Sequence, residues 1–424
     1  MPLYDLRLSV FLSGDGKEFF MHEIITHLGW KKQTAFFLIS QNISLFGSSV
    51  VGFAVICHIT LETSSGVWMM IAMLCNLAPQ FFVSLFAGVW ADRYNRKFLI
   101  MLADGFIAVA TLALAISFLL GFRKLELLLA VLAARALGAS VQTPAVNAIY
   151  PQLAPEERLT KVQGVNQTIA SISALVTPAV GGLLLVTAGI VGALFVDVVT
   201  AAIAIAITSF IRVRQPPKSH NKSVWKEIGV GISYIREHAK LRRLFICLLF
   251  TFSFVTPAFT LTPLMIERSF GNEVWRLTVH EIVWSGAMIA SGVFVSVKGK
   301  FQNKQRTIAL CIVGFGVMFA LMGLSWNYLS FLLFLGVAGL FWPVLSTVQT
   351  VFVQEAAPPD MLGRVISVIH LIITGTVPVA ILFYGPLADV VRIETILLIS
   401  SALLAAVGVI YSFSGTNRSS SFHK

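Results

Sequence analysis

Residues 162–211 read VQGVNQTIASISALVTPAVGGLLLVTAGIVGALFVDVVTAAIAIAITSFI, and Asp197 is the one charged residue in this stretch. A helix needs about 20 mostly apolar residues to cross the hydrocarbon core of a membrane. This stretch is long enough for two crossings, and Gly189 near its middle can adopt the backbone of a tight turn. The stretch therefore predicts two membrane-spanning helices joined by a short turn.

The rest of the chain repeats this pattern of long apolar stretches between charges. Residues 307–354 can again form two helices, with a break near Trp326 and Asn327, and residues 277–279 can lengthen the short stretch that follows them. The other stretches with at most one charge are 33–61, 63–91, 98–122, 127–155, 244–266, 282–297, 365–388 and 395–417. The sequence thus predicts an all-α membrane protein with twelve transmembrane helices. Its 57% hydrophobic and 12% charged residues exclude an ordinary soluble protein.

Basic residues are distributed unequally between the two sides of this predicted topology. If the N-terminus is cytoplasmic, that side carries 25 of the 31 basic residues, and Arg135 lies within a span. The opposite side carries the remaining five: Arg123, Lys124, Arg268, Arg276 and Arg392. Because cytoplasmic loops are enriched in Lys and Arg, we expect both termini to be cytoplasmic. The net charge of +11 then reflects topology, and nucleic-acid binding is disfavoured because no soluble domain concentrates the charge.

The chain divides into two halves that echo one another. APEERLTKV at 154–162 resembles APPDMLGRV at 357–365, and each segment follows one span and opens the next. We therefore expect two six-helix, pseudo-symmetric halves at 34–211 and 241–413. In transporters built from such repeats, the substrate site lies near the midplane between the repeats.

Three segments lie outside these halves. Residues 1–33 and 414–424 are expected to be cytoplasmic tails, with residues 1–20 disordered. Residues 212–240 form a linker with large apolar residues at helical spacing: Trp225, Ile228, Ile232 and Ile235. This spacing predicts an amphipathic helix at the cytoplasmic interface, and the alternative is a soluble linker helix.

A charged loop joins the second and third spans, where residues 88–97 read GVWADRYNRK. Gly88 permits close helix approach, and Asp92 can pair with Arg96 or face the positive end of a neighbouring helix. Such a cluster can hold the cytoplasmic side shut and must break for that side to open. The alternative is a basic loop that only sets topology. The predicted conformational switch comprises Gly88, Asp92, Arg93, Arg96 and Lys97.

Spans five and eleven carry proline and glycine motifs. In span five, Pro178, Gly181 and Gly182 can bend the helix and let it pack closely on a neighbour, although a generic kink is the alternative. Span eleven ends in GPLAD at 385–389, which echoes the GVWAD at 88–92 on the opposite membrane face. Inverted echoes of this kind are expected within transporter repeats, and the alternative is ordinary helix-end turn chemistry.

Four ionisable residues lie within the spans, where a charge is costly and usually functional. They are Asp104, Arg135, Asp197 and Glu281. A carboxylate that water reaches alternately from each side can couple proton flow to transport. We expect Asp104 to do so ahead of Asp197, with Arg135 as a candidate counter-charge of Asp104. The alternative for each carboxylate is a permanent structural role.

Polar and aromatic side chains elsewhere in the spans are candidates for the substrate cavity. These candidates are Gln41, Asn42, Phe252, Trp342 and Gln349. The alternative for the aromatic candidates is packing or contact with lipid.

The loop at 88–97 resembles the G-x-L-A-D-R-x-G-R-K motif of the major facilitator superfamily. Trp90 replaces the Leu of that motif and Asn95 replaces its second Gly. Since Asn tolerates left-handed backbone, we expect Asn95 to stand in for the glycine. Residues 173–182, SALVTPAVGG, are similar to the superfamily's antiporter motif G-x-x-x-G-P-x-x-G-G, with Ser and Thr in place of two glycines.

Shorter matches resemble the macrolide-efflux branch of this superfamily, which also contains siderophore exporters. They are QNISL at 41–45, TPAVNA at 143–148 and LGRV at 362–365. The resemblance implies a secondary transporter that exports a hydrophobic or amphiphilic small molecule, such as a macrolide, in exchange for protons. It does not name the substrate.

Other readings of the sequence belong to different functional classes. They are an exporter of siderophores or other secreted metabolites, a lysophospholipid facilitator without proton coupling, and a non-transporting membrane sensor. An enzyme or an ATP-driven pump is disfavoured because the sequence lacks the phosphate-binding pattern G-x-x-x-x-G-K-[S/T]. We expect a monomer in the bacterial cytoplasmic membrane without cofactor or metal. Its expected partners are the substrate, protons and lipid.

Overall fold

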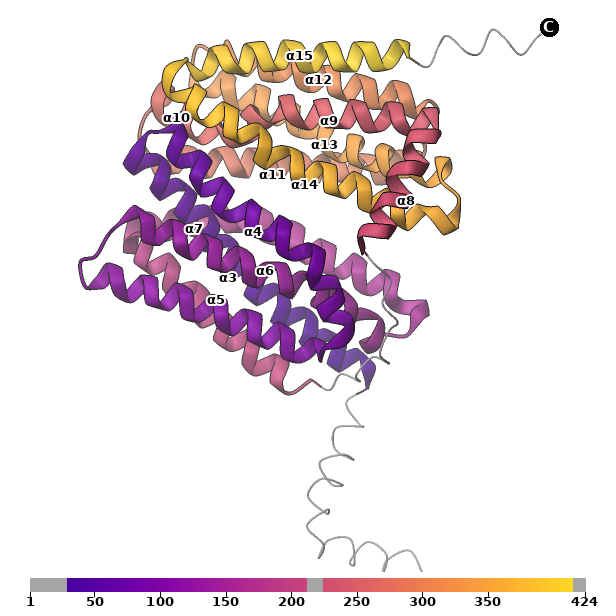
Figure 1. The fold of residues 1–424 in the computed structure, drawn as a ribbon. Helices are drawn as coiled ribbons and strands as arrows, with labels where there is room; N and C mark the ends of the chain where they lie inside the picture. Colours follow the sequence, from indigo (N-terminus) through magenta and orange to yellow (C-terminus); the bar gives the residue numbers. More distant parts are fainter. Residues whose placement is uncertain (1–28, 212–223, 415–424) are drawn as a thin grey trace, which may run out of the picture.

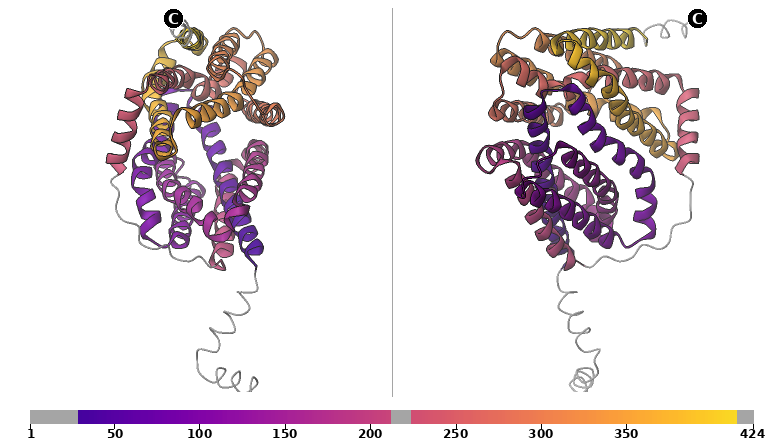
Figure 2. Two further views of the ribbon diagram at one scale, coloured as in Figure 1. Left: turned by 90° about the vertical axis from the view of Figure 1, so that its right-hand side faces the viewer. Right: turned by 60° about the vertical axis from the view of Figure 1, so that its left-hand side comes forward.

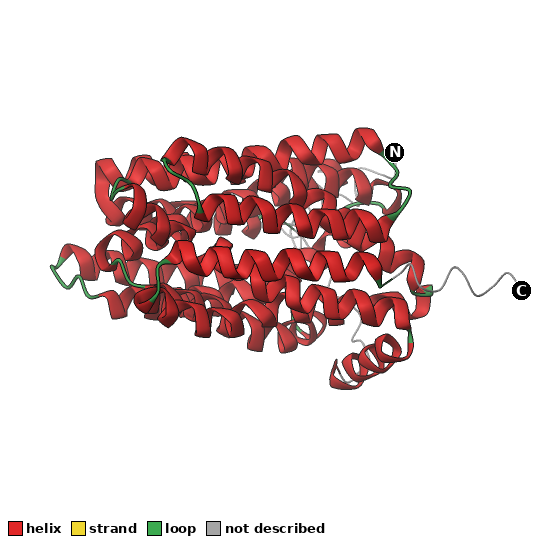
Figure 3. Cartoon of the chain, turned by 90° about the horizontal axis from the view of Figure 1, so that it is seen from above, coloured by secondary structure: helices red, strands yellow, loops and turns green. Residues whose placement is uncertain are grey.

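The structure is a computed structural model of the 424-residue chain and describes residues 29–211 and 224–414. The expectations for the two tails fall almost entirely outside the described residues, as does the first part of the linker. Every regular element in the described part is helical, and short loops join the helices (Figure 3). This agrees with the all-α class predicted from the sequence.

The first half contains five long helices and a single 3-10 turn at Glu156–Arg158. The helices are α3 (Trp30–Thr63), α4 (Gly66–Arg93), α5 (Arg96–Leu119), α6 (Leu125–Leu153) and α7 (Leu159–Ser209). Gly189 interrupts α7 with φ 63° and ψ −172°, a conformation that side chains with a Cβ rarely adopt. The interruption turns α7 into two passes and confirms the predicted turn.

The second half follows the linker helix α8 (Val224–Glu237). Its helices are α9 (Ala239–Thr260), α10 (Thr262–Phe270), α11 (Val274–Lys298), α12 (Lys304–Gly323), α13 (Tyr328–Ala356), α14 (Pro359–Val390) and α15 (Ile393–Phe413). The interval between α12 and α13 confirms the predicted break near Trp326. Eleven described segments are long and apolar enough to cross a membrane, with α9 and α10 counted as one. Because α7 makes two passes, the chain has the twelve crossings that the sequence predicts.

The two halves lie side by side as separate groups of helices. Figure 1 shows the first half, from indigo to magenta, below the second half, from red through orange to yellow, and Figure 2 shows the same division in two other views. The halves meet mainly where α4 packs on α14 and where α7 packs on α11. The outer end is defined here as the end of the bundle where α4 begins and α14 ends. The charge distribution predicts that this end faces away from the cytoplasm.

Large apolar side chains project outward from both halves, as lipid contact requires. Examples with more than half of the side chain exposed are Leu183, Val186, Phe383 and Val390. A soluble monomer rarely exposes such extensive apolar surface. This surface supports a multi-pass membrane protein.

The linker helix α8 packs against the second half. Ile235 is buried, and α8 contacts both α14 and α9. Ile228 is half-buried against the same core, whereas Ile232 is exposed. The predicted helix is therefore present, and part of its apolar face is covered by protein. The side chain of Trp225 is not among those described.

Orientation in the membrane stays a prediction that cysteine labelling can test. A chain with a single added cysteine at Asn272 should react with a membrane-impermeant thiol reagent on intact cells, because the charge distribution places this loop outside. A cysteine at Ser219 in the linker should react only after the cells are permeabilised. Labelling at 219 but not at 272 in intact cells would reverse the topology. The native cysteines are replaced by serine or alanine in both variants.

Candidate functional site

The loop between α4 and α5 is anchored to the first half by two of its basic side chains. Arg96 donates to the backbone oxygen of Ala148 in α6 at 2.8 Å. Lys97 Nζ donates to the backbone oxygen of Ser209, the last residue of α7, at 2.6 Å. These two hydrogen bonds connect the start of α5 to α6 and α7 of the first half. The side chains of Asp92 and Arg93 are not among those described, so their switch role stays a prediction.

Asn95 lies directly before α5 and caps the start of that helix. Its backbone is extended, with φ −62° and ψ 110°, and its side-chain oxygen accepts from the backbone N–H groups of Lys97 and Phe98. This is the geometry of a helix N-cap, for which Asn is among the favoured residues. Asn95 therefore does not use the left-handed backbone that its residue type tolerates. The side chain is used as a cap instead.

A buried ion pair joins α6 to the second pass of α7. Arg135 donates to Asp197, and both side chains are more than nine-tenths buried. Arg135 also donates to Thr111 in α5 at 2.7 Å and to the backbone oxygen of Ser48 in α3 at 3.1 Å. The Ser48 and Thr111 hydroxyls in turn donate to Asp197 at 3.0 and 3.1 Å. Arg135 is thus the counter-charge of Asp197, and its predicted pairing with Asp104 is wrong.

Asp104 lies elsewhere in the same bundle and is 2% exposed. One of its oxygens accepts from Ser44 Oγ at 2.6 Å and from Gln142 Nε2 at 2.7 Å. The other oxygen, Oδ2, is buried and has no hydrogen-bond partner among the described residues. The two buried aspartates therefore differ in kind. Asp197 is fully paired with a cation, and Asp104 is bonded on one side by neutral donors.

The proline–glycine segment of α7 lies where this helix touches both halves. A side chain added at Gly181 would meet Phe53 of α3, and one added at Gly182 would meet Thr278 of α11 in the other half. Pro178 and Thr177 are buried beside them. The small residues therefore allow α7 to pack closely on two neighbours, as the sequence predicted.

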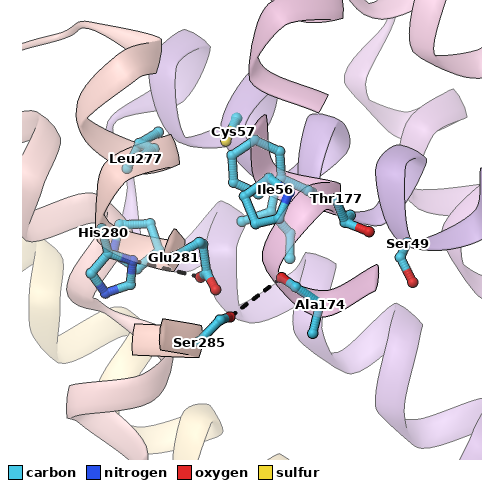
Figure 4. Close-up of a pocket in the computed structure, with 12 residues that line it drawn as sticks. Ser49, Ile56, Cys57, Ala174, Thr177, Leu277, His280, Glu281 and Ser285 are labelled. Carbon is cyan, nitrogen blue, oxygen red and sulfur yellow. Dashed lines mark hydrogen bonds and ion pairs between the residues drawn. The ribbon is translucent and has the colours of Figure 1, made fainter. Parts of the chain in front are cut away.

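A pocket of about 300 Å³ lies between the halves next to this segment (Figure 4). Its walls come from α3 and α7 in the first half and from α10 and α11 in the second. Figure 4 shows the Glu281 carboxylate pointing from α11 toward α3 and α7. His280 Nδ1 lies 3.6 Å from Glu281 Oε1, and Ser285 donates to the backbone oxygen of Ala174 across the halves at 3.3 Å. Of the predicted ionisable residues, Glu281 is the one that lines this pocket.

The five candidates for the substrate cavity do not line this pocket. Gln41, Asn42, Phe252 and Gln349 are buried, and Trp342 is half-buried. Asn42 donates to Asn166 of α7 at 3.0 Å, and the ring of Phe252 meets that of Trp342 at 6.1 Å. Both polar atoms of Gln41 are buried without a partner among the described residues. Their described contacts lie within their own halves.

At the outer end, a cluster of hydrogen bonds joins the halves. Asp389 at the end of α14 accepts from the backbone N–H groups of Gly66 and Val67 at 2.6 and 3.0 Å and from Ser65 Oγ at 2.8 Å. Arg268 of α10 donates to Asp389 at 2.9 Å and to the backbone of Ser64. The carboxylate thus faces the positive end of α4. We call Arg268, Asp389 and residues 64–67 the outer latch.

Glycines let the two helices approach closely beside the outer latch. A side chain added at Gly66 would clash with the backbone of Gly385, and its Cβ would lie 2.8 Å from that of Ala388. The outer end is closed in this structure by this contact and by the latch. The echo at 385–389 pointed to Asp389, but sequence reasoning missed Arg268. The signal available for it was an Arg directly after Glu267 at the end of an apolar span.

Comparisons with known proteins agree with this architecture. A family model described as Major Facilitator Superfamily matches residues 37–380. Macrolide efflux protein A of Streptococcus pyogenes is 28% identical over 387 residues, which are 90% of this chain and 95% of that protein. Macrolide efflux protein A of Enterococcus faecalis is 30% identical over 300 residues, which are 69% of this chain and 93% of that protein.

Among solved structures, the nucleoside transporter NupG has the same fold. Its TM-score is 0.71 at 13% identity, with 90% of this chain and 99% of the other covered. This likeness concerns the fold alone. The family match places the chain among transporters and not among enzymes. With twelve membrane passes in two halves and a family model that covers most of its length, the chain belongs to the major facilitator superfamily.

Proposed function

We propose that the chain is a proton-coupled exporter of hydrophobic or amphiphilic small molecules, macrolides among them, that works by alternating access. The similarity to two macrolide efflux proteins over most of the chain supports the substrate class. The closed outer end and the pocket between the halves support a cycle in which the halves separate first on one side and then on the other.

The buried carboxyl group of Asp104 is the observation that supports proton coupling. Its Oδ2 has no partner among the described residues, and no described cation pairs with it. An unpaired charge is expensive in such a place. A proton on Oδ2 would remove this charge, and its release to water in another state of the cycle would restore it. Asp104 can thus change charge during the cycle without breaking an ion pair.

Asp197 is a weaker candidate for this role. Its carboxylate is held by Arg135 and by two hydroxyl groups. Protonation of Asp197 would leave Arg135 buried without its counter-charge, which is costly. We therefore assign Asp197 a structural role and keep Asp104 as the coupling residue.

A vesicle transport assay tests the proposed function. The purified chain is reconstituted in proteoliposomes with an imposed proton gradient, and uptake of macrolides, dyes, siderophores and lysophospholipids is compared with and without an uncoupler. Macrolide uptake that the uncoupler abolishes is expected. Siderophore uptake alone would favour the metabolite-exporter alternative. Lysophospholipid movement that is the same with and without the uncoupler would favour a facilitator.

Replacing Asp104 by Asn should separate proton coupling from substrate movement. Asn is neutral, as a protonated Asp is, so the Asp104→Asn chain should still exchange labelled for unlabelled substrate across the membrane without a gradient. Uphill transport and substrate-induced proton flux should fall to background, because no proton is carried. A pH-sensitive dye inside the vesicles measures the flux.

The matched control for this prediction is Glu394→Gln. Glu394 accepts a hydrogen bond from Ser269 within the second half, whereas the hydrogen bonds of Asp104 lie in the first half. The control should keep both activities. Unchanged proton flux in Asp104→Asn would show that Asp104 is structural.

A further inference from the structure

The pocket between the halves contains one carboxylate, that of Glu281. Its side chain is 39% exposed, although α11 is a membrane-spanning helix. Among the described residues, His280 is its one ionisable partner, at 3.6 Å and charged only if protonated. No described Lys or Arg pairs with it. Glu281 thus presents a negative charge to a cavity without a fixed counter-cation.

The walls that face Glu281 are largely apolar. They include Phe53 and Ile56 of α3, Pro178 of α7 and Leu277 of α11. Besides His280, the polar groups of the walls are hydroxyl-bearing or sulfur-bearing side chains, namely Ser49, Thr177, Ser285 and Cys57. An apolar pocket with a small number of placed polar groups is typical of a site for small organic ligands. At about 300 Å³, this pocket is at the small end of that range and fits one part of a larger compound.

We propose that Glu281 binds the protonated amine of the transported compound, so that the preferred substrates are amphiphilic monocations. This inference rests on the proposed export function and names the chemistry that its substrates share. A carboxylate inside a membrane region is stabilised by a positive partner, and the described protein supplies none except His280. The ammonium group supplies that charge, while the apolar walls contact the carbon atoms next to it. Because both halves build the pocket, a bound cation is also released when the halves separate there.

The position of Glu281 distinguishes it from the two buried aspartates. Asp104 and Asp197 are at most 2% exposed and bonded inside the first half. Glu281 lies at the surface where the halves meet and is open to the cavity. Substrate contact is therefore available to Glu281 and not to the aspartates in this structure.

The test compares a basic compound with its neutral analogue in reconstituted vesicles. The probes are a macrolide that carries a dimethylamino group and the same macrolide with one of the two N-methyl groups replaced by an acetyl group, so that the nitrogen is a neutral amide. The variants are Glu281→Gln, which removes the charge at nearly the same size, and Glu281→Asp, which keeps the charge. Glu394→Gln is the control, since it removes a carboxylate that lies outside this pocket.

In Glu281→Gln, the KM for the amine should rise about tenfold or more, as loss of a charge-assisted hydrogen bond predicts, while the KM for the neutral analogue stays the same. Glu281→Asp should recover part of the affinity, and Glu394→Gln should leave the KM for both probes unchanged. Equal loss for both probes, or no change for either, would overturn the inference. Loss of proton flux with both probes would overturn it too and would make Glu281 a coupling residue. A native chain that transports neither probe would instead refute the proposed function.

Discussion

The Arg135→Met substitution is expected to lower the free energy of unfolding by roughly 3–5 kcal/mol, because it leaves the Asp197 carboxylate buried and without a charged partner. The hydroxyl groups of Ser48 and Thr111 would still donate to Asp197, but neither carries a charge. Reversible unfolding in mixed micelles, followed by circular dichroism and tryptophan fluorescence, measures the change. Transport by this variant should be lost in proportion to the folded fraction.

The double variant Arg135→Met/Asp197→Leu is the control for this prediction. Replacing both members of a buried pair by apolar side chains is often close to neutral for stability. The double variant should therefore regain most of the stability that the single variant loses. If Arg135→Met were as stable as the native chain, water would have to reach Asp197. The Arg135–Asp197 pair would then not be needed for the stability of the first half.

Replacing Asp389 by Asn is expected to open the outer end. The carboxylate accepts from two backbone N–H groups at the start of α4 and from Arg268, and a charged acceptor contributes to such bonds more than a neutral one. If the closed state is destabilised by about 1.4 kcal/mol relative to the open state, the ratio of open to closed molecules rises about tenfold. Transport should fall because the substituted chain closes its outer end less often.

Distances between spin labels measure this shift. Phe122 and Trp326 are exposed near the outer end on different halves. With spin labels at these two positions, Asp389→Asn should show a population of molecules with a longer distance between the labels. Glu394→Gln is the matched control, since its hydrogen bond lies within the second half. A distance distribution identical to that of the native chain would show that the latch does not hold the halves together.

The features predicted correctly from the sequence are those that depend on local composition. The crossings follow from the spacing of charges, and the turn at Gly189 follows from a glycine in the middle of an apolar stretch. The echo at 385–389 marked the end of span eleven, but the bonds of Asp389 to Arg268 and to the start of α4 were not predicted. Each of these signals lies within a few dozen residues of chain.

The errors concern which side chains meet across helices. Arg135 could face Asp104 or Asp197, and the rotation of α6 about its axis decides between them. That rotation depends on packing along the whole helix. The cap formed by Asn95 was also missed, because the family pattern has glycine there and suggested a backbone conformation in place of a side-chain function. The exposure of Glu281 to the pocket depends on how the halves meet, which no local pattern records.

The contact between Gly66 and Gly385 has a practical consequence. Because the backbones touch there, even one methyl group at Gly66 would act as a wedge between α4 and α14. Such a wedge leaves every charge of the latch in place, so it separates sterics from electrostatics. A Gly66→Ala chain would therefore trap the form that is open at the outer end, and it would be suited to raising conformation-specific antibodies and to finding inhibitors that enter from that end.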